Sequence, residues 1–90
     1  MKYEIWQLKA EKLRAYGFMD YEWATEHGFD FNHYEKVYEG DNLENLEDIF
    51  FHFNMRRPTD FRGHSLSVSD IVVLNGEKFY CDRIGWKKLD

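Results

Sequence analysis

An Asn75-Gly76 pair between two runs of alternating apolar residues restricts the fold of this 90-residue chain more than any other feature. Both residues tolerate positive φ angles, so the pair predicts a two-residue β-hairpin turn. The flanking strands are expected over 68–74 and 77–82. A two-residue loop places Leu74 opposite Glu77 and Val72 opposite Phe79. The hairpin then presents two apolar faces, with Val72, Leu74, Phe79 and Cys81 on one and Ile71, Val73 and Tyr80 on the other.

Further segments of alternating apolar residues indicate the remaining strands. Residues 2–8 have apolar side chains on both faces, which is typical of a central strand. The other candidates are residues 33–39, residues 86–89 after a bend at Gly85, and the more weakly patterned residues 14–18 after a turn over 9–12.

Apolar residues at helical spacing predict a main helix over 42–53. Asp41 and Glu44 resemble a capping box at its start, and Asn54 is a plausible C-terminal cap. A shorter helix is predicted from an N-cap at Asp20 to about residue 27, where Gly28 ends it in the left-handed conformation. Five side chains of the main helix fall on one arc and are expected in the core: Leu43, Leu46, Ile49, Phe50 and Phe53.

The length of the chain and the absence of a linker or repeat predict one domain. Three Trp, six Tyr and eight Phe residues supply most of the side-chain volume of its core. We therefore expect a single α+β domain over residues 1–90. It should contain a small mixed or antiparallel sheet of four to five strands, ending in a β-hairpin, with two helices on one side of the sheet.

Charge is divided unevenly along the chain. Residues 1–54 hold 12 acids and 5 bases, whereas residues 55–90 hold 5 acids and 7 bases. The acidic first half repels polyanions, so the sequence disfavours a nucleic-acid partner. Cys81 is the only cysteine, which excludes an internal disulfide and favours a reducing compartment. No signal peptide or membrane-spanning run is found, so we expect a cytoplasmic protein without a membrane partner.

One string resembles a catalytic motif. Residues 63–67, Gly-His-Ser-Leu-Ser, match four of the five positions of the nucleophile elbow of α/β hydrolases. Ser67 replaces the last glycine, and the string precedes a predicted strand instead of following one, so an esterase is disfavoured. We expect Ser65, Ser67, Ser69 and Asp70 to bond to nearby backbone amides in an irregular loop. Since no ligand pair has metal-binding spacing, no catalytic, cofactor or metal residue is predicted.

Two surfaces are candidates for contacts. Phe51 points away from the apolar arc of the main helix, among acids that include Glu47 and Asp48, and should be an exposed anchor for a basic partner. The favoured alternative is that the C-terminal segment covers Phe51. The second surface suits single-stranded nucleic acid, although ion pairing with the acidic first half explains its cations more simply. It comprises Arg56, Arg57, Arg62, Arg83, Lys87 and Lys88, interleaved with Phe61, Phe79 and Trp86.

Three stretches together resemble the YodL-like domains encoded by conjugative transposons, phages and some Firmicute chromosomes. They are residues 3–9 with Arg14, residues 34–40 leading into 46–50, and a more specific set of Phe53-Asn54, Pro58, Asp60-Phe61, residues 63–71, Tyr80-Cys81-Asp82 and Gly85-Trp86. Trp86 stands where the family usually has Phe, and Cys81 where a small or apolar residue is expected. The resemblance implies a mobile-element accessory protein and brings no established catalytic residues. It also makes residues 54–70 a partner-binding loop if they are shared for function.

We therefore expect an accessory protein of a conjugative transposon or related element, acting as a noncatalytic module that binds an unknown protein of the host or element. The candidate partner-binding residues are Glu47, Asp48, Phe51, Arg56, Arg57, Asp60, Phe61, His64 and Ser65. The alternative is an acidic antirestriction-type mimic of nucleic acid, and an enzyme ranks third. The mimic would use the carboxylates of Glu35, Glu39, Asp41, Glu44, Glu47 and Asp48. The oligomeric state is left open.

Overall fold

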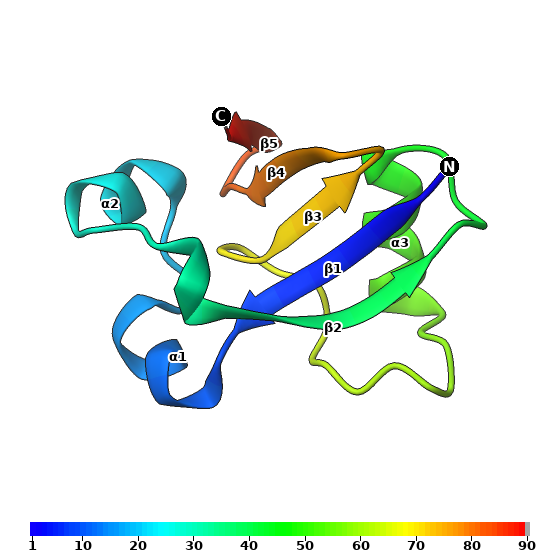
Figure 1. Ribbon diagram of the computed structural model, residues 1–90, viewed down its shortest axis with the longest axis horizontal. Coiled ribbons are helices and arrows are strands. Elements are labelled where there is room, and N and C mark those ends of the chain that lie inside the picture. Colours follow the sequence, from blue (N-terminus) through cyan, green and yellow to red (C-terminus); the bar gives the residue numbers. More distant parts are fainter. Residues whose placement is uncertain (90) are drawn as a thin grey trace.

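A computed structural model describes residues 1–89. Five strands form one sheet in the order β2-β1-β3-β4-β5, and every neighbouring pair is antiparallel (Figure 1). The predicted α+β class and its antiparallel alternative are therefore confirmed. The strands are β1 (Tyr3–Leu8), β2 (Tyr34–Gly40), β3 (Ile71–Leu74), β4 (Glu77–Cys81) and β5 (Trp86–Leu89). The helices are α1 (Ala10–Tyr16), α2 (Tyr21–Glu26), the 3₁₀ helix η1 (Phe31–His33) and α3 (Leu46–Met55).

The β3–β4 hairpin has the predicted register. Leu74 pairs with Glu77 and Val72 with Phe79. Asn75 and Gly76 have φ angles of 51° and 84°, as the two-residue turn requires. The strand begins at Ile71 instead of the predicted residue 68, because Ser69, with φ 86°, lies in a turn closed by the bond from the Asp70 amide to the Ser67 carbonyl.

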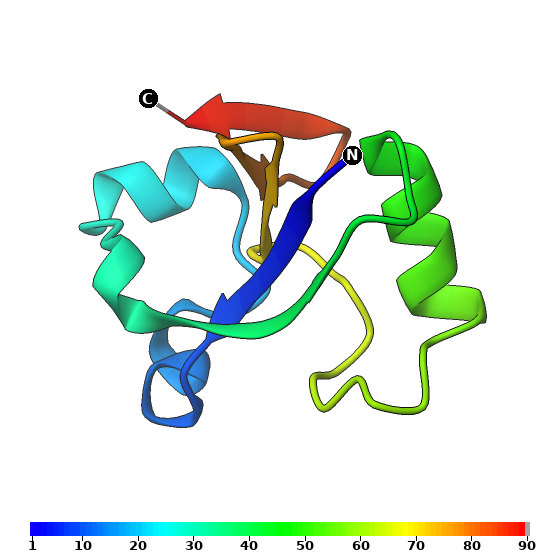
Figure 2. The same ribbon diagram turned by 45° about the vertical axis from the view of Figure 1, so that its right-hand side comes forward.

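Helices cover both faces of the sheet, so the prediction of two helices on one side is wrong. Figure 2 shows α3 on one side and α1, α2 and η1 on the other. The cause lies in β1 and the hairpin, which carry apolar side chains on both faces and need cover on both. The α3 core contains Tyr3, Ile5, Ile49, Phe53, Leu66 and Val72. The α2 core contains Leu8, Ala24, Tyr34, Ile71 and Tyr80.

Residues 14–18 do not form the predicted strand, and residues 9–12 are not a simple turn. Helix α1 spans Ala10–Tyr16, with Lys9 as its N-cap residue. Leu13 and Tyr16 lie three residues apart, so they share one helix face, and both pack against the α2 core. Tertiary packing of that face outweighs the weak alternation in the sequence.

Helix α3 starts later than predicted. Its N-cap is Asn45, whose side-chain oxygen accepts a hydrogen bond of 2.8 Å from the Asp48 amide, so the proposed capping box at Asp41 and Glu44 is wrong. Asn54 lies within the helix and is not its C-cap, because its side chain donates back to a main-chain carbonyl one turn earlier and the helix continues to Met55.

The predicted core arc of α3 is largely, but not fully, buried. Ile49 and Phe53 are fully buried, and Leu43 and Leu46 pack against the α3 core at its margin. Phe50 is 40% exposed, which corrects its assignment to the core. The centre of the buried face therefore lies along Ile49 and Phe53, and Phe50 falls at its edge.

The shorter helix and the last strand agree with the sequence. Asp20 caps α2 by accepting a 2.9 Å bond from the Trp23 amide, and Gly28 follows with φ 87°. Gly85, with φ 73°, forms the bend before β5. Within residues 1–89, no helix is both long and apolar enough to cross a membrane.

Candidate functional site

A groove of about 490 Å³ lies between α3 and the β4–β5 turn. Its α3 wall carries two adjacent aromatic rings, and its other wall runs from the end of β4 through the turn to the first residue of β5. We call it the edge groove, because β5 is an edge strand of the sheet. It is lined by Glu47, Phe50, Phe51, Asn54 and Met55 of α3 and by Cys81, Asp82, Arg83, Gly85 and Trp86.

Large apolar side chains on the α3 wall of this groove are exposed. Phe51 is 55% exposed and Met55 is 69% exposed. Phe50 packs edge-on against Trp86, with ring centroids 6.3 Å apart, which links the two walls. The predicted exposure of Phe51 is confirmed. The alternative, in which the C-terminal segment covers that ring, is wrong because this segment forms the facing wall instead.

The edge groove continues along α3. A second hollow of about 500 Å³ shares Glu47 and Trp86 with it and is also lined by Asn45, Leu46 and Leu74. The two hollows follow the helix from its N-cap to its last residue, Met55. An elongated, mostly apolar depression of this kind suits a segment of polypeptide better than a compact small molecule.

Charged groups frame the groove. Glu47 and Asp48 lie exposed on the first turn of α3. At the other end, Arg83 approaches the Asp20 carboxylate at 3.5 Å. The Asp82 carboxylate accepts hydrogen bonds from the main-chain amides of Tyr21 and Arg83. The turn that carries Arg83 is thereby tied to the start of α2.

The loop from residue 56 to residue 70 holds the other predicted contact residues but packs largely onto the sheet. Phe61 packs against Phe53 and Tyr38, with ring centroids 5.0 and 6.0 Å apart. Burial, followed by the charge and hydrogen bond of Asp60, raises the pKa of the Tyr38 hydroxyl. Arg56, Arg57 and Ser65 are exposed. The nine predicted residues are therefore split, with Glu47 and Phe51 in the edge groove and the rest beyond it.

A buried polar cluster holds that loop against β1. The Gln7 carboxamide donates to the His64 carbonyl (2.8 Å) and to Asp70 Oδ2 (3.1 Å), and its oxygen accepts from the His64 amide (3.2 Å). Asp70 Oδ2 also accepts from the Ser67 amide at 2.8 Å. Asp70 is only 1% exposed, and burial raises its pKa to about 7. The Ser69 hydroxyl accepts from a main-chain amide, that of Phe18.

The geometry around His64 differs from a hydrolase site. Its Nδ1 lies 2.8 Å from the main-chain oxygen of Ser65, and its Nε2 lies 3.9 Å from Asp70 Oδ1. Ser65 itself is exposed. The expected bond to a nearby backbone amide is confirmed for Asp70, which accepts from Ser67. Ser69 instead accepts from the distant amide of Phe18, and the buried Ser67 hydroxyl has no hydrogen-bond partner among the described residues.

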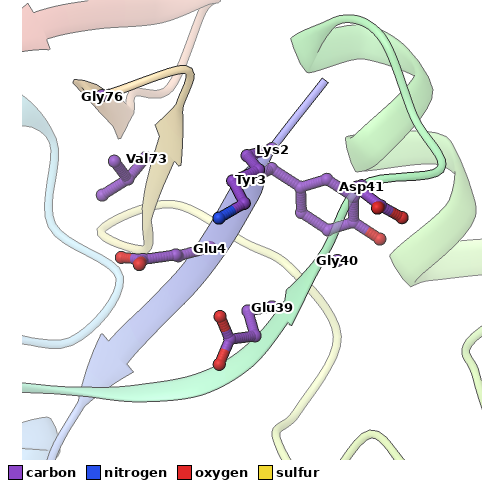
Figure 3. Close-up of a pocket in the computed structure, with 8 residues that line it drawn as sticks. All are labelled: Lys2, Tyr3, Glu4, Glu39, Gly40, Asp41, Val73 and Gly76. Atoms are coloured by element: carbon purple, nitrogen blue, oxygen red, sulfur yellow. The ribbon is translucent and has the colours of Figure 1, made fainter.

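The acids of the mimicry alternative lie on β2, the turn after it and the start of α3. Figure 3 shows Glu4 and Glu39 on neighbouring strands in a hollow of about 410 Å³ that also includes Asp41. Lys36 lies between these carboxylates, 3.8 Å from Glu4 and 3.4 Å from Glu39. The N-terminal amine approaches Glu44 at 3.5 Å. Two of the six acids named for mimicry thus have a cation beside them.

Several groove residues were missed by sequence reasoning. Phe50, Met55, Arg83 and Trp86 line the groove but were not assigned to it. The run Ile49-Phe50-Phe51 was a usable signal, because successive residues on a helix point about 100° apart and three in a row span more than one apolar stripe. In residues 1–89, no group of three or more His, Cys, Asp or Glu side chains could hold a metal ion.

A five-stranded antiparallel sheet covered by helices on both faces defines a small α+β domain with two cores and an open apolar groove at one edge of the sheet. The model of the YodL-like domain matches residues 2–90, so the chain belongs to the YodL-like domain family. This confirms the resemblance seen in the sequence. No curated protein and no solved structure matched the chain.

Proposed function

We propose that this YodL-like domain is a noncatalytic protein-interaction module, an accessory protein of a conjugative transposon or related mobile element. It binds a protein of the host or of the element through the edge groove. The observation that carries the proposal is the row of exposed apolar side chains, Phe50, Phe51 and Met55, facing Trp86 across the groove.

The energetics support a contact surface. Apolar surface left in water forgoes roughly 25 cal/mol for each Å² that burial would remove from solvent. Aromatic side chains in such surfaces tend to dominate binding energy when a partner covers them. Glu47 at one end and Arg83 at the other give the groove a polar rim. An apolar centre with a charged rim is the usual composition of a protein interface.

The His64–Asp70 pair supports a structural role. The Asp70 carboxylate is sealed from solvent and accepts a bond from Gln7, which fastens the loop to β1, and one from the Ser67 amide, which closes the loop on itself. A general base needs reach to a substrate proton, which a side chain 1% exposed does not have.

The test is affinity capture from a lysate of the host with wild-type protein and two matched variants. Phe51→Asn removes an aromatic ring that is 55% exposed in the groove, and Phe18→Asn removes one that is 58% exposed elsewhere. Asn suits the positive φ of 64° at Phe18. We expect Phe51→Asn to bind the captured protein at least about ten-fold more weakly than wild type, a loss of about 1.4 kcal/mol in binding free energy. Phe18→Asn should bind it as wild type does. Equal capture by wild type and Phe51→Asn would refute the proposal.

Ionic strength separates this function from nucleic-acid mimicry. Contacts through apolar groups weaken little with salt, whereas a mimic's contacts between exposed charges weaken steeply. We expect the captured protein to stay bound when salt is raised from about 0.1 M to about 1 M, where the screening length falls from about 10 Å to about 3 Å. Release over that range, together with loss of capture in Glu35→Gln or Glu39→Gln, would favour the mimic instead.

A further inference from the structure

The shape and charge of the edge groove indicate how its partner binds, an inference that rests on the proposed function. We propose that the partner docks as an extended segment that pairs with β5 as a sixth strand. Its apolar side chains enter the edge groove, and acidic side chains alternate with them along the segment. The partner class is therefore a peptide segment in which apolar and acidic residues alternate.

The backbone of β5 is oriented for such pairing. The Asp82 amide donates to the Gly85 carbonyl at 3.0 Å and closes the β4–β5 turn, so the next pair, Cys81 and Trp86, is a non-hydrogen-bonded pair. Cys81 accordingly directs its N–H and C=O toward the Ser69–Asp70 segment, with bonds of 2.8 and 2.9 Å. Trp86 directs its own N–H and C=O the opposite way, to the open edge of the sheet.

The groove lies where the side chains of an added strand would fall. Trp86 belongs both to the edge strand and to the groove lining. Alternate residues of a strand point to the same face, about 7 Å apart, so a segment beside β5 sends every second side chain toward the α3 face. Phe51 and Met55 are exposed in the groove that Trp86 also lines. A sixth strand would cover apolar surface that the five existing strands leave open.

Charge selects the occupant. Lys87 is a middle residue of β5 and points to the face opposite Trp86, because neighbouring residues of a strand alternate between faces. Lys88 already pairs with Glu77 at 2.7 Å, and Arg83 approaches Asp20 at 3.5 Å, so the cation that selects the occupant is Lys87. Acidic residues on the face of the added segment away from α3 would lie opposite Lys87. A second copy pairing β5 with β5 in antiparallel register would place lysine opposite lysine, which is unfavourable. Pairing of β5 with β2 of another copy would leave open edges and grow into fibres.

A defined probe tests this mode. We would titrate the protein with a soluble peptide of about eight residues in which Val alternates with Glu, and with a matched peptide in which Lys replaces Glu. The Val-Glu peptide should bind at least about ten-fold more tightly than the Val-Lys peptide. The variant Lys87→Glu should reverse this preference, whereas Arg14→Glu, an equal charge change on α1, should not.

Hydrogen exchange reports the backbone contact. Binding of the Val-Glu peptide should slow exchange of the Trp86 amide by at least about ten-fold, because that N–H becomes hydrogen-bonded. Failure of the Val-Glu peptide to bind, equal binding of the two peptides, an unprotected Trp86 amide or concentration-dependent oligomers of the protein alone would each overturn the inference.

The two proposals fail separately. Capture that ignores Phe51→Asn removes the groove as the contact surface, and with it both proposals. Capture that depends on Phe51 while the Trp86 amide stays unprotected in the captured complex removes only strand pairing. That second result would point to a helix or a folded surface in the groove.

Discussion

Gly63 is required by its neighbours and not by its backbone angles. A Cβ atom at this position would collide with the Gln7 carboxamide oxygen and would lie 2.9 Å from the Phe61 ring. The Gln7 carboxamide is fixed by three hydrogen bonds to His64 and Asp70, so it cannot move without breaking them. We predict that Gly63→Ala lowers the free energy of unfolding by about 1–3 kcal/mol, measured by chemical denaturation.

A double-mutant cycle isolates the cause of that loss. Gln7→Ala alone should cost a similar amount, because it leaves the buried Asp70 carboxylate with one fewer donor. The double variant Gln7→Ala, Gly63→Ala should cost clearly less than the sum, since the alanine at 63 then has no carboxamide to displace. Simple additivity would show that the cost at Gly63 has another origin.

Asp70 gives the stability a distinctive dependence on pH. Burial, opposed by the contacts with Ser67, His64 and Gln7, raises its pKa from 3.8 to about 7. Between these values the folded state binds more protons than the unfolded state. This carboxyl group therefore lowers stability as pH rises from about 4 to about 7, by up to about 1 kcal/mol per pH unit, and has a constant effect above that range.

Substitution of Asp70 by asparagine should remove this contribution. We expect the difference in unfolding free energy between wild type and Asp70→Asn to change steadily across that window and to level off on both sides. Asp48→Asn, which neutralises an exposed carboxylate on α3, serves as the matched control. If the two variants gave the same pH profile, the buried carboxyl group would not be the source.

At the level of elements, sequence patterns of short range predicted most of the strands. The hairpin register followed from Asn75 and Gly76, and the α2 cap from Asp20, because each depends on residues close in the chain. Helix α1 escaped prediction since its helical form depends on packing of Leu13 and Tyr16 against distant strands. Sequence reasoning placed Phe51 at a contact surface, but the groove also requires Trp86, which only the folded sheet brings to α3.

Two residues, Asp41 and Asn45, are candidates for the N-cap of α3. The sequence favoured Asp41, whereas the structure uses the Asn45 side chain to satisfy the Asp48 amide. We predict that Asn45→Ala lowers the unfolding free energy by about 1 kcal/mol, or roughly 4–8 °C in melting temperature for a domain of this size. Asp41→Ala should change stability much less. If Asp41→Ala lowered the melting temperature more than Asn45→Ala, the helix would begin at Asp41 as the sequence predicted.

For the molecule as a whole, one sheet is shared by two cores. Neighbouring residues of β3 point to opposite faces, with Val72 in the α3 core and Ile71 in the α2 core. Strand β1 likewise supplies Ile5 to the first and Leu8 to the second. Neither core can lose its strands without exposing the other. We infer that the two cores unfold together, although helices on opposite faces cover them (Figure 2).

Two matched substitutions test this coupling. Ile5 and Ile71 are both 0% exposed, in different cores, and Ile→Val at a buried site costs about 0.5–1.5 kcal/mol. Melting would be followed by NMR through the methyl groups of Ile49 in the α3 core and of Leu8 in the α2 core. We predict that Ile5→Val and Ile71→Val each shift both methyl transitions by the same amount, because the transition is all-or-none. If Ile5→Val lowered the Ile49 transition and left that of Leu8 in place, the α3 core would unfold as a separate unit. In that case α3 would have to leave its face of the sheet while β1 and β3 stay paired, since both strands also supply the α2 core.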